Sequence, residues 1–194
     1  MSQVSAGALE ARINQISVVT AEGLRELCAC AQPCQLLKKQ FLFQAGEICQ
    51  SIYFVEKGYV RAFYQAENGQ QVNSRFYFED DFATDLQSLR TKQPAKVSLL
   101  AEEEVQAWEW SKETLLQVFA ASAELAAFER HLLGHLLLKQ EAQTQLFQHH
   151  GPAERYEQLV RDNPQVIQRV SLSQLASYLG MARETLSRLR NPKL

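Results

Sequence analysis

The sequence has no apolar run long enough to cross a bilayer, and it lacks a basic start followed by an apolar stretch. Its densest apolar segment, Leu132 to Leu138, is interrupted by Gly134 and His135. A transmembrane helix needs about 20 predominantly apolar residues, and a secretory signal needs a basic and then an apolar region. We therefore expect a cytoplasmic protein that has no membrane partner.

Histidine and cysteine are scarce, with four of each in 194 residues. No histidine lies between residues 41 and 110, which excludes the His-ligated metal of cupin-like β-barrel enzymes. The cysteine spacing matches no zinc or iron–sulfur pattern with a mechanical basis. We interpret the thiols as reduced and predict no metal, with a metal or redox cluster as the alternative. The cysteines are Cys28, Cys30, Cys34 and Cys49.

The motifs of common enzyme classes are also missing. There is no Gly-rich phosphate loop, no serine in a G-x-S-x-G elbow and no paired catalytic constellation. We therefore predict no catalytic residues and a protein that is not an enzyme. The apolar content of 46% and the charged content of 22% are those of a globular protein with a proper core.

Periodicity predicts two kinds of structure in the first 110 residues. Residues 1–35 follow helical spacing, with a second short helix over 21–30 that Pro33 ends. From Phe41 to Trp110 the period becomes two, which indicates short strands. Asn68-Gly69 predicts a two-residue hairpin turn with positive φ at both positions. The expected strand segments are 52–55, 59–64, 72–78, 97–100 and 105–110, which together suggest a β-roll or small barrel.

From Ser111 the pattern is helical for about 35 residues, with a new start at Ser122. Its apolar stripe is broader than packing against one β-roll requires, so we expect part of it to pack on a second copy of the chain. His131 and His135 lie four residues apart and could chelate a metal, but a surface or dimer-contact role is commoner. The stripe consists of Leu125, Phe128, Leu132, Leu133, Leu136 and Leu137.

The segment from Ser171 to Arg190 predicts two short helices joined by a tight turn. Ser171 or Ser173 can cap the first helix, and Gly180 can adopt the left-handed conformation of the turn. The second helix is expected from Ala182 to Arg190. We expect Ala176 to allow a close helix crossing, and the shared core to contain Leu175, Leu179, Met181, Leu186 and Leu189.

The polar residues of the second helix are suited to reading DNA. Arginine matches the two acceptors of guanine, Glu184 can accept from cytosine, and Thr185, Ser187 or Lys193 can reach phosphates. Residues 169–194 contain five basic residues and one acid, a net charge of +4, which leaves −6 for the rest of the chain. Such a basic end on an acidic body favours local phosphate binding. The expected DNA-binding residues are Arg183, Glu184, Thr185, Ser187, Arg188 and Arg190.

The segment from Ala182 to Arg188, ARETLSR, closely resembles the recognition helix of the Crp/Fnr family of bacterial transcription regulators. The resemblance implies that Arg183, Glu184 and Arg188 contact base edges and that Thr185 contacts a phosphate. Upstream, F-x-x-G-E at 43–47 and the strand pair at 52–60 resemble that family's cyclic-nucleotide-binding β-roll. The resemblance implies a homodimer on a double-stranded DNA operator, with RNA polymerase as a further partner.

This resemblance implies an α+β fold with three parts. They are a double-stranded, jelly-roll-like β-roll sensor with N-terminal helices over residues 1–120, a dimerisation helix over 121–150, and a helix-turn-helix domain over 151–194. Only four residues follow Arg190, so we expect either that the strand pair that usually follows the recognition helix is reduced or absent, or that the recognition helix frays more in this protein.

The sequence departs from the family pattern where cyclic AMP would bind. Family members use a Gly-Glu pair for the ribose and an Arg-Ser pair for the cyclic phosphate. Here Thr84 and Asp85 stand for the first pair, and Ala95 and Lys96 for the second. Lysine replaces the bidentate arginine only as a point charge, so we expect a small-molecule effector other than cyclic AMP. These four residues are the candidate effector pocket. The alternative is a ligand-binding or protein-interaction module whose helix-turn-helix does not bind DNA.

Overall fold

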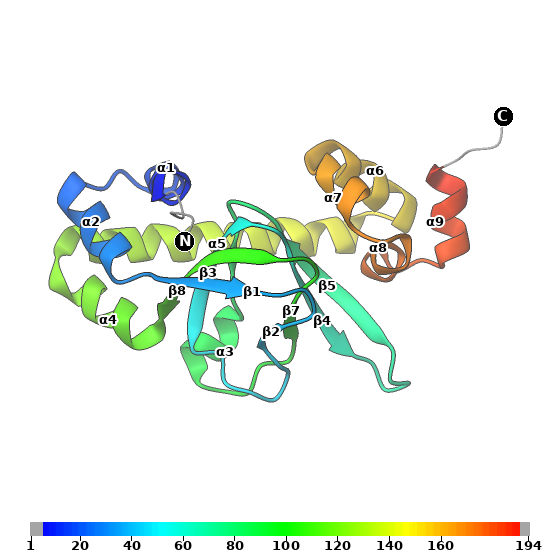
Figure 1. Ribbon diagram of the computed structural model, residues 1–194. Helices are drawn as coiled ribbons and strands as arrows, with labels where there is room; N and C mark the ends of the chain where they lie inside the picture. The colour runs from blue at the N-terminus through cyan, green and yellow to red at the C-terminus, as the bar shows by residue number, and fades with distance from the viewer. Residues whose placement is uncertain (1–5, 191–194) are drawn as a thin grey trace. The chain divides into compact units, whose positions relative to one another are not determined.

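The computed structural model describes residues 6–190, and these residues form two compact units. The first unit comprises residues up to 62 together with 76–137, and the second comprises 63–75 together with 138 onward. The chain thus leaves the first unit within a β-hairpin, returns to it, and leaves again within a long helix (Figure 1). Lys193 and any structure after the last helix lie outside the described residues.

Two four-stranded antiparallel sheets build the predicted β-roll. In the first sheet, whose strand order is β1-β8-β3-β6, β8 pairs with both β1 and β3, and Phe54 in β3 lies opposite Trp108. The second sheet has the order β2-β7-β4-β5. The predicted α+β class is therefore confirmed. The strands are β1 (Gln32–Leu36), β2 (Phe41–Phe43), β3 (Ser51–Lys57), β4 (Val60–Gln65), β5 (Gln71–Tyr77), β6 (Phe82–Ala83), β7 (Ser98–Ala101) and β8 (Val105–Ser111).

Two N-terminal helices, α1 (Ala6–Ile16) and α2 (Ala21–Ala29), pack on the first unit. The indole of Trp110 donates to the Leu27 carbonyl at 2.8 Å, which fixes the end of α2 on β8. The helical prediction for residues 1–35 is wrong at its end, because β1 begins at Gln32. Pro33 is tolerated there because β1 is an edge strand.

The turn of the β4–β5 hairpin is longer than the sequence predicted. Of the two turn residues, only Gly69 has a positive φ, at 78°. Its N–H donates to the Ala66 carbonyl at 2.8 Å, and the Ala66 N–H donates to the Gln70 carbonyl at 2.9 Å. These bonds match a β-turn followed by a left-handed glycine, the usual three-residue alternative to a two-residue turn.

Helices follow the last strand, and the predicted break at Ser122 is confirmed. Ser122 is extended, at φ −146° and ψ 151°, and its hydroxyl accepts from the Leu125 N–H. No helix within residues 6–190 is long and apolar enough to cross a membrane. The remaining helices are α3 (Leu86–Thr91), α4 (Lys112–Ala121), α5 (Ala123–His149), α6 (Pro152–Asp162), α7 (Pro164–Arg169), α8 (Leu172–Leu179) and α9 (Arg183–Arg190).

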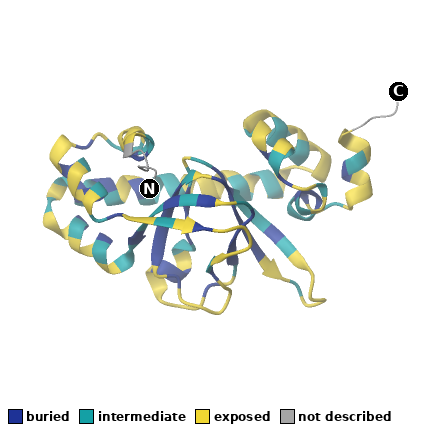
Figure 2. Cartoon of the chain, viewed as in Figure 1, coloured by how far each residue is buried: buried dark blue, intermediate teal, exposed yellow. Residues whose placement is uncertain are grey.

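Each of the two units has its own buried residues (Figure 2). The core of the first unit runs from Leu9 and Ile13 of α1 through the strands to Leu132 of α5. In the second unit, Val166 and Val170 are buried, and so are Leu175, Leu179 and Leu186 of α8 and α9.

Candidate nucleic-acid interface

Local capping determines where α8 begins and where the turn after it falls. The Ser171 hydroxyl accepts from the Gln174 N–H at 3.3 Å, and the Gln174 side chain accepts from the Ser171 N–H at 3.4 Å. This reciprocal pair is a capping box. Gly180 ends the helix in the left-handed conformation at φ 72° and ψ 36°. Ser171 and Gly180 therefore have the predicted structural roles.

Most of the predicted core between α8 and α9 is buried. Leu175, Leu179 and Leu186 have no exposed surface, and Ala176 is 2% exposed, as expected where two helices approach closely. The prediction is wrong for Leu189, which is 38% exposed. It lies in the last turn of α9, beyond the part of that helix that α8 covers.

The polar face of α9 points to solvent. Arg183, Glu184, Thr185, Arg188 and Arg190 are exposed, and Ser187 is half-buried. Within residues 6–190, Arg183 and Arg188 form no hydrogen bond and no ion pair. Arg190 reaches the Ile167 carbonyl at 3.5 Å, at the outer limit of a hydrogen bond. Two guanidinium groups are thus left available to an external acceptor.

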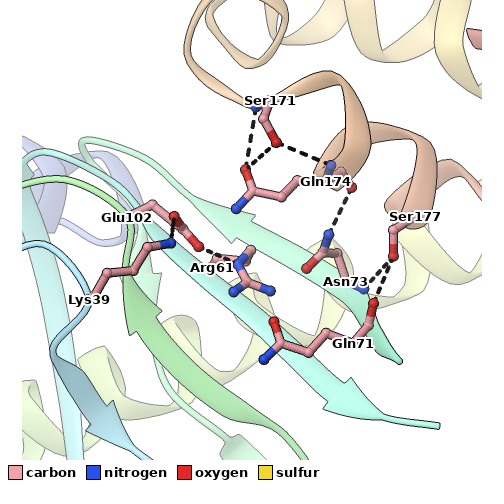
Figure 3. Close-up of polar contacts among 8 residues, drawn as sticks. All are labelled: Lys39, Arg61, Gln71, Asn73, Glu102, Ser171, Gln174 and Ser177. Carbon is pink, nitrogen blue, oxygen red and sulfur yellow. Dashed lines mark hydrogen bonds and ion pairs between the residues drawn. The ribbon is translucent and has the colours of Figure 1, made fainter. Parts of the chain in front are cut away.

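The β4–β5 hairpin holds α8 through polar contacts that sequence reasoning missed. The Asn73 side chain donates to the Gln174 carbonyl at 2.8 Å, and the Asn73 N–H donates to the Ser177 hydroxyl at 3.2 Å. That hydroxyl donates to the Gln71 carbonyl at 3.2 Å (Figure 3). The partners are about a hundred residues apart in the sequence, so no local pattern could have indicated them.

Arg155 of α6 joins the ends of two helices. One guanidinium nitrogen donates to the Phe147 carbonyl of α5 at 2.7 Å, and another donates to the Leu179 carbonyl of α8 at 3.2 Å. The guanidinium also lies 4.6 Å from the centroid of the Phe147 ring. A cation at two helix C-termini satisfies carbonyls that have no intrahelical partner. Arg155 therefore positions α8, and through it α9.

In the candidate effector segment, the polar groups of Thr84 and Asp85 are used within the protein. The Thr84 hydroxyl donates to the Ser51 carbonyl at 3.0 Å and is buried. The Asp85 carboxylate caps α3 by accepting from the Ser88 N–H at 3.0 Å. A carboxylate in this place repels a phosphate rather than binding it.

The second pair of the segment is divided between interior and surface. Ala95 is buried and exchanges backbone hydrogen bonds with the loop before β3, to Glu47 and from Gly46. Lys96 is exposed. The structure thus brings the four predicted residues to one region of the roll but does not gather four polar side chains around one space.

Part of the chain matches a known protein family. The family model described as "Cyclic nucleotide-binding domain" matches residues 33–122. This part of the chain is therefore similar to cyclic nucleotide-binding domains. A search by sequence found no matching curated relative.

Solved regulators of the Crp/Fnr family have the same fold as this chain. The c-di-GMP-responsive global regulator CLP of Xanthomonas campestris is 19% identical with a TM-score of 0.64, over 89% of this chain and 91% of that one. FixK2 of Bradyrhizobium japonicum is 17% identical with a TM-score of 0.65, over 84% and 83%. The catabolite activator protein of Thermus thermophilus is 18% identical with a TM-score of 0.58, over 93% and 85%. The predicted resemblance is thus confirmed in the fold.

The segment over residues 33–122 contains an ion cluster that the sequence did not reveal, in which Arg61 and Glu102 are buried and Lys39 is partly exposed. One Glu102 oxygen lies 2.5 Å from the Arg61 guanidinium and the other lies 2.5 Å from the Lys39 ammonium (Figure 3). Burial by itself raises the pKa of Glu102, but the hydrogen bonds and charges of Lys39 and Arg61 outweigh it and hold the pKa below its usual value. Glu102 is therefore ionised and paired.

All four cysteines, Cys28, Cys30, Cys34 and Cys49, are free thiols. Burial raises the pKa of Cys28, Cys30 and Cys34, which keeps these thiols protonated and weakly reactive. Among the described residues, no group of three or more His, Cys, Asp or Glu side chains is arranged to hold a metal ion. His131 and His135 instead contact the N-terminal segment, through Ser17 at 2.8 Å and Arg12 at 3.0 Å.

Proposed function

We propose that the protein is a sequence-specific DNA-binding transcription regulator of the Crp/Fnr type, and that α8 and α9 form its helix-turn-helix. One observation carries the proposal: Arg183 and Arg188 project from a firmly held helix and have no partner within residues 6–190. Arginines that only stabilised a helical hairpin would be expected to pair with acids, and the sole acid of α9, Glu184, is exposed as well.

On DNA, each residue of the exposed face takes the role that its chemistry allows. Arg183 and Arg188 donate to base edges, guanine being the best match for a guanidinium, and Glu184 accepts from cytosine. Thr185, Ser187 and Arg190 lie beside them and contact the phosphate backbone, which sets the position of the helix but carries no sequence information. Specificity then depends mainly on two arginines.

Selection of bound sites from a pool of random duplexes tests this function. The wild type should enrich an inverted repeat, and its affinity should fall steeply as salt rises, because phosphate binding releases counterions. Arg183→Ala and Arg188→Ala should each weaken binding to the enriched site by about 1–3 kcal/mol. Arg161→Ala removes an exposed arginine of α6 and is the matched control. Failure to enrich any site would favour a module whose helix pair does not bind DNA.

We further propose a homodimer formed along α5. Leu137 and Leu138 are 63% and 71% exposed, and they continue the apolar stripe beyond the part that the chain itself buries. A two-fold dimer places its two recognition helices about 34 Å apart, one turn of DNA. In sedimentation, Leu137→Glu should shift the protein to monomer. Leu37→Glu, at a leucine that is 67% exposed outside α5, should leave the dimer intact.

The roll is proposed as the sensor part of the three-part organisation, with boundaries at residues 1–120, 121–150 and 151–194. Its effector is expected to differ from cyclic AMP, because Asp85 and Ala95 replace groups that would bind the ribose and phosphate. Calorimetric titration with cyclic AMP should therefore give no heat of binding, and tight binding would contradict this expectation. RNA polymerase is the proposed further partner at promoters.

A further inference from the structure

A pocket in the first unit lies outside the candidate effector segment. It is formed by α3, α4 and α5 over β3, and its empty volume, which includes its open mouth, is about 440 Å³. The volume that the centre of a water-sized sphere can occupy is about 50 Å³. Eight of its eleven lining residues are apolar, and Leu116 at its surface is 51% exposed. The pocket is thus an apolar space that a ligand can reach from solvent.

The three remaining lining residues are charged. Arg90 pairs with Glu129 at 3.0 Å, and the Arg90 side chain is 55% exposed. The Lys112 ammonium donates to the Leu89 carbonyl near the end of α3. Two cations face one carboxylate, so one positive charge is left uncompensated. The Arg90 guanidinium has more donors than one carboxylate oxygen can use.

We propose that this pocket binds a free alkyl carboxylate, with the alkyl chain among the leucines and the carboxylate at Arg90 and Lys112. Such a ligand combines the two features of the pocket, because its chain gains from leaving water and its single negative charge matches the surplus positive charge. A neutral alcohol would contact only the apolar residues. An alkyl amine would be repelled by Arg90 and Lys112, because its own charge is positive. This site does not depend on DNA binding by α9.

Titration with octanoate, decanoate and dodecanoate below their micellar concentrations tests the apolar part. Affinity should rise by roughly fourfold for each added methylene until the pocket is full. At equal chain length, decanoate should bind about tenfold more tightly than 1-decanol, and decylamine should not bind. Equal binding of decanoate and decylamine, or no saturable binding of decanoate, would overturn the proposal.

Variants locate the site in the full-length protein. Leu116→Trp places a larger ring at the mouth of the pocket and should weaken decanoate binding about tenfold or more. Arg90→Gln should weaken it by a similar factor through the lost charge. Their controls are Leu37→Trp, at an exposed leucine elsewhere, and Lys38→Gln, which removes an equal charge at an exposed position outside both the pocket and the candidate effector segment. Both controls should bind decanoate as the wild type does.

Two results would count against the pocket. If Lys96→Gln abolished decanoate binding while Arg90→Gln retained it, the ligand would belong to the segment that contains Thr84 and Asp85. If Leu116→Trp altered the oligomeric state without changing decanoate affinity, this face would be a contact between subunits. Retained binding of duplex DNA by Arg90→Gln would show that any loss of decanoate binding is separate from the function of α9.

Discussion

Arginine has opposite roles in the roll and in the C-terminal helix pair. In the roll, Arg61 is 4% exposed and ion-paired with Glu102, so its charge is paired inside the protein. In α9, Arg183 and Arg188 are exposed and form no bond within residues 6–190. Arg155 also has a structural role, like Arg61, because its guanidinium donates to carbonyls at the ends of two helices. A charged side chain that stabilises the fold is therefore distinguished from one available to a partner by its contacts rather than by its residue type.

The largest effect expected from this comparison is the loss of stability when the buried cluster is broken. Glu102→Gln should lower the free energy of unfolding by about 3–5 kcal/mol, because the buried Arg61 loses the charge of Glu102. Urea unfolding measures this, with the exposed Glu104→Gln as control. A loss below about 1 kcal/mol would mean that the cluster is no more valuable than a surface ion pair.

The same cluster predicts how stability depends on pH. The pKa of Glu102 is lowered on folding from its usual value of 4.5, so its contribution is fully present above that value and is lost as pH falls through the lowered pKa. Urea midpoints for wild type and Glu102→Gln should therefore converge as the solution is acidified from neutral. A constant difference between them down to the acid limit would contradict the assignment.

Removal of the guanidinium of Arg155 should have a smaller effect. Arg155→Met keeps much of the apolar stem but loses charge-assisted bonds to the Phe147 and Leu179 carbonyls, at a cost of about 2–3 kcal/mol. Thermal unfolding should show a lower midpoint for Arg155→Met. The midpoint should hardly change for Arg161→Met on the same helix. If both variants unfolded alike, Arg155 would not be what positions α8.

The turn between α8 and α9 should be sensitive to a single methyl group. Gly180→Ala forces alanine into φ 72° and should cost about 1 kcal/mol. The added Cβ would meet nothing closer than Arg155 at 3.5 Å, so the cost is conformational. Gly134→Ala, inside α5 where the new Cβ meets nothing within 4 Å, should instead stabilise by up to about 1 kcal/mol. Equal signs for the two variants in urea unfolding would contradict this explanation.

The smallest effect on stability is expected for the exposed arginines of α9. Arg183→Ala and Arg188→Ala should change the free energy of unfolding by no more than about 0.5 kcal/mol, as is usual for exposed positions without partners. Calorimetry on the protein without DNA measures this. A loss comparable to that of Arg155→Met would place these arginines among the structural ones.

Local structure could be predicted from the sequence where it depends on neighbouring residues. The cap at Ser171, the turn at Gly180 and the break at Ser122 each follow from residue chemistry within a few positions, and all three were predicted. The strand that begins at Gln32 was missed, because its pairing with β8 depends on residues about 75 positions away. The contacts of Asn73 with α8 were missed for the same reason, because they join residues about a hundred positions apart.

The candidate site was predictable only in part, for a similar reason. The exposed face of α9 follows from helical periodicity, although Leu189 lies outside the core that the period assigned to it. In the effector segment, the family resemblance suggested a pocket formed by Thr84, Asp85, Ala95 and Lys96, whereas capping and backbone pairing occupy Asp85 and Ala95. The apolar pocket of α3, α4 and α5 had no sequence signal, because its lining comes from four separate elements.

The central claim is that the guanidinium groups of α9 read base pairs. The most direct measurement is a competition titration of the selected duplex and its single-base-pair substitutions against wild type, Arg183→Ala and Arg188→Ala. The account predicts that each variant loses about 1–3 kcal/mol of discrimination at one base pair and retains it at the others. A uniform loss at every position, or unchanged discrimination at all of them, would contradict it.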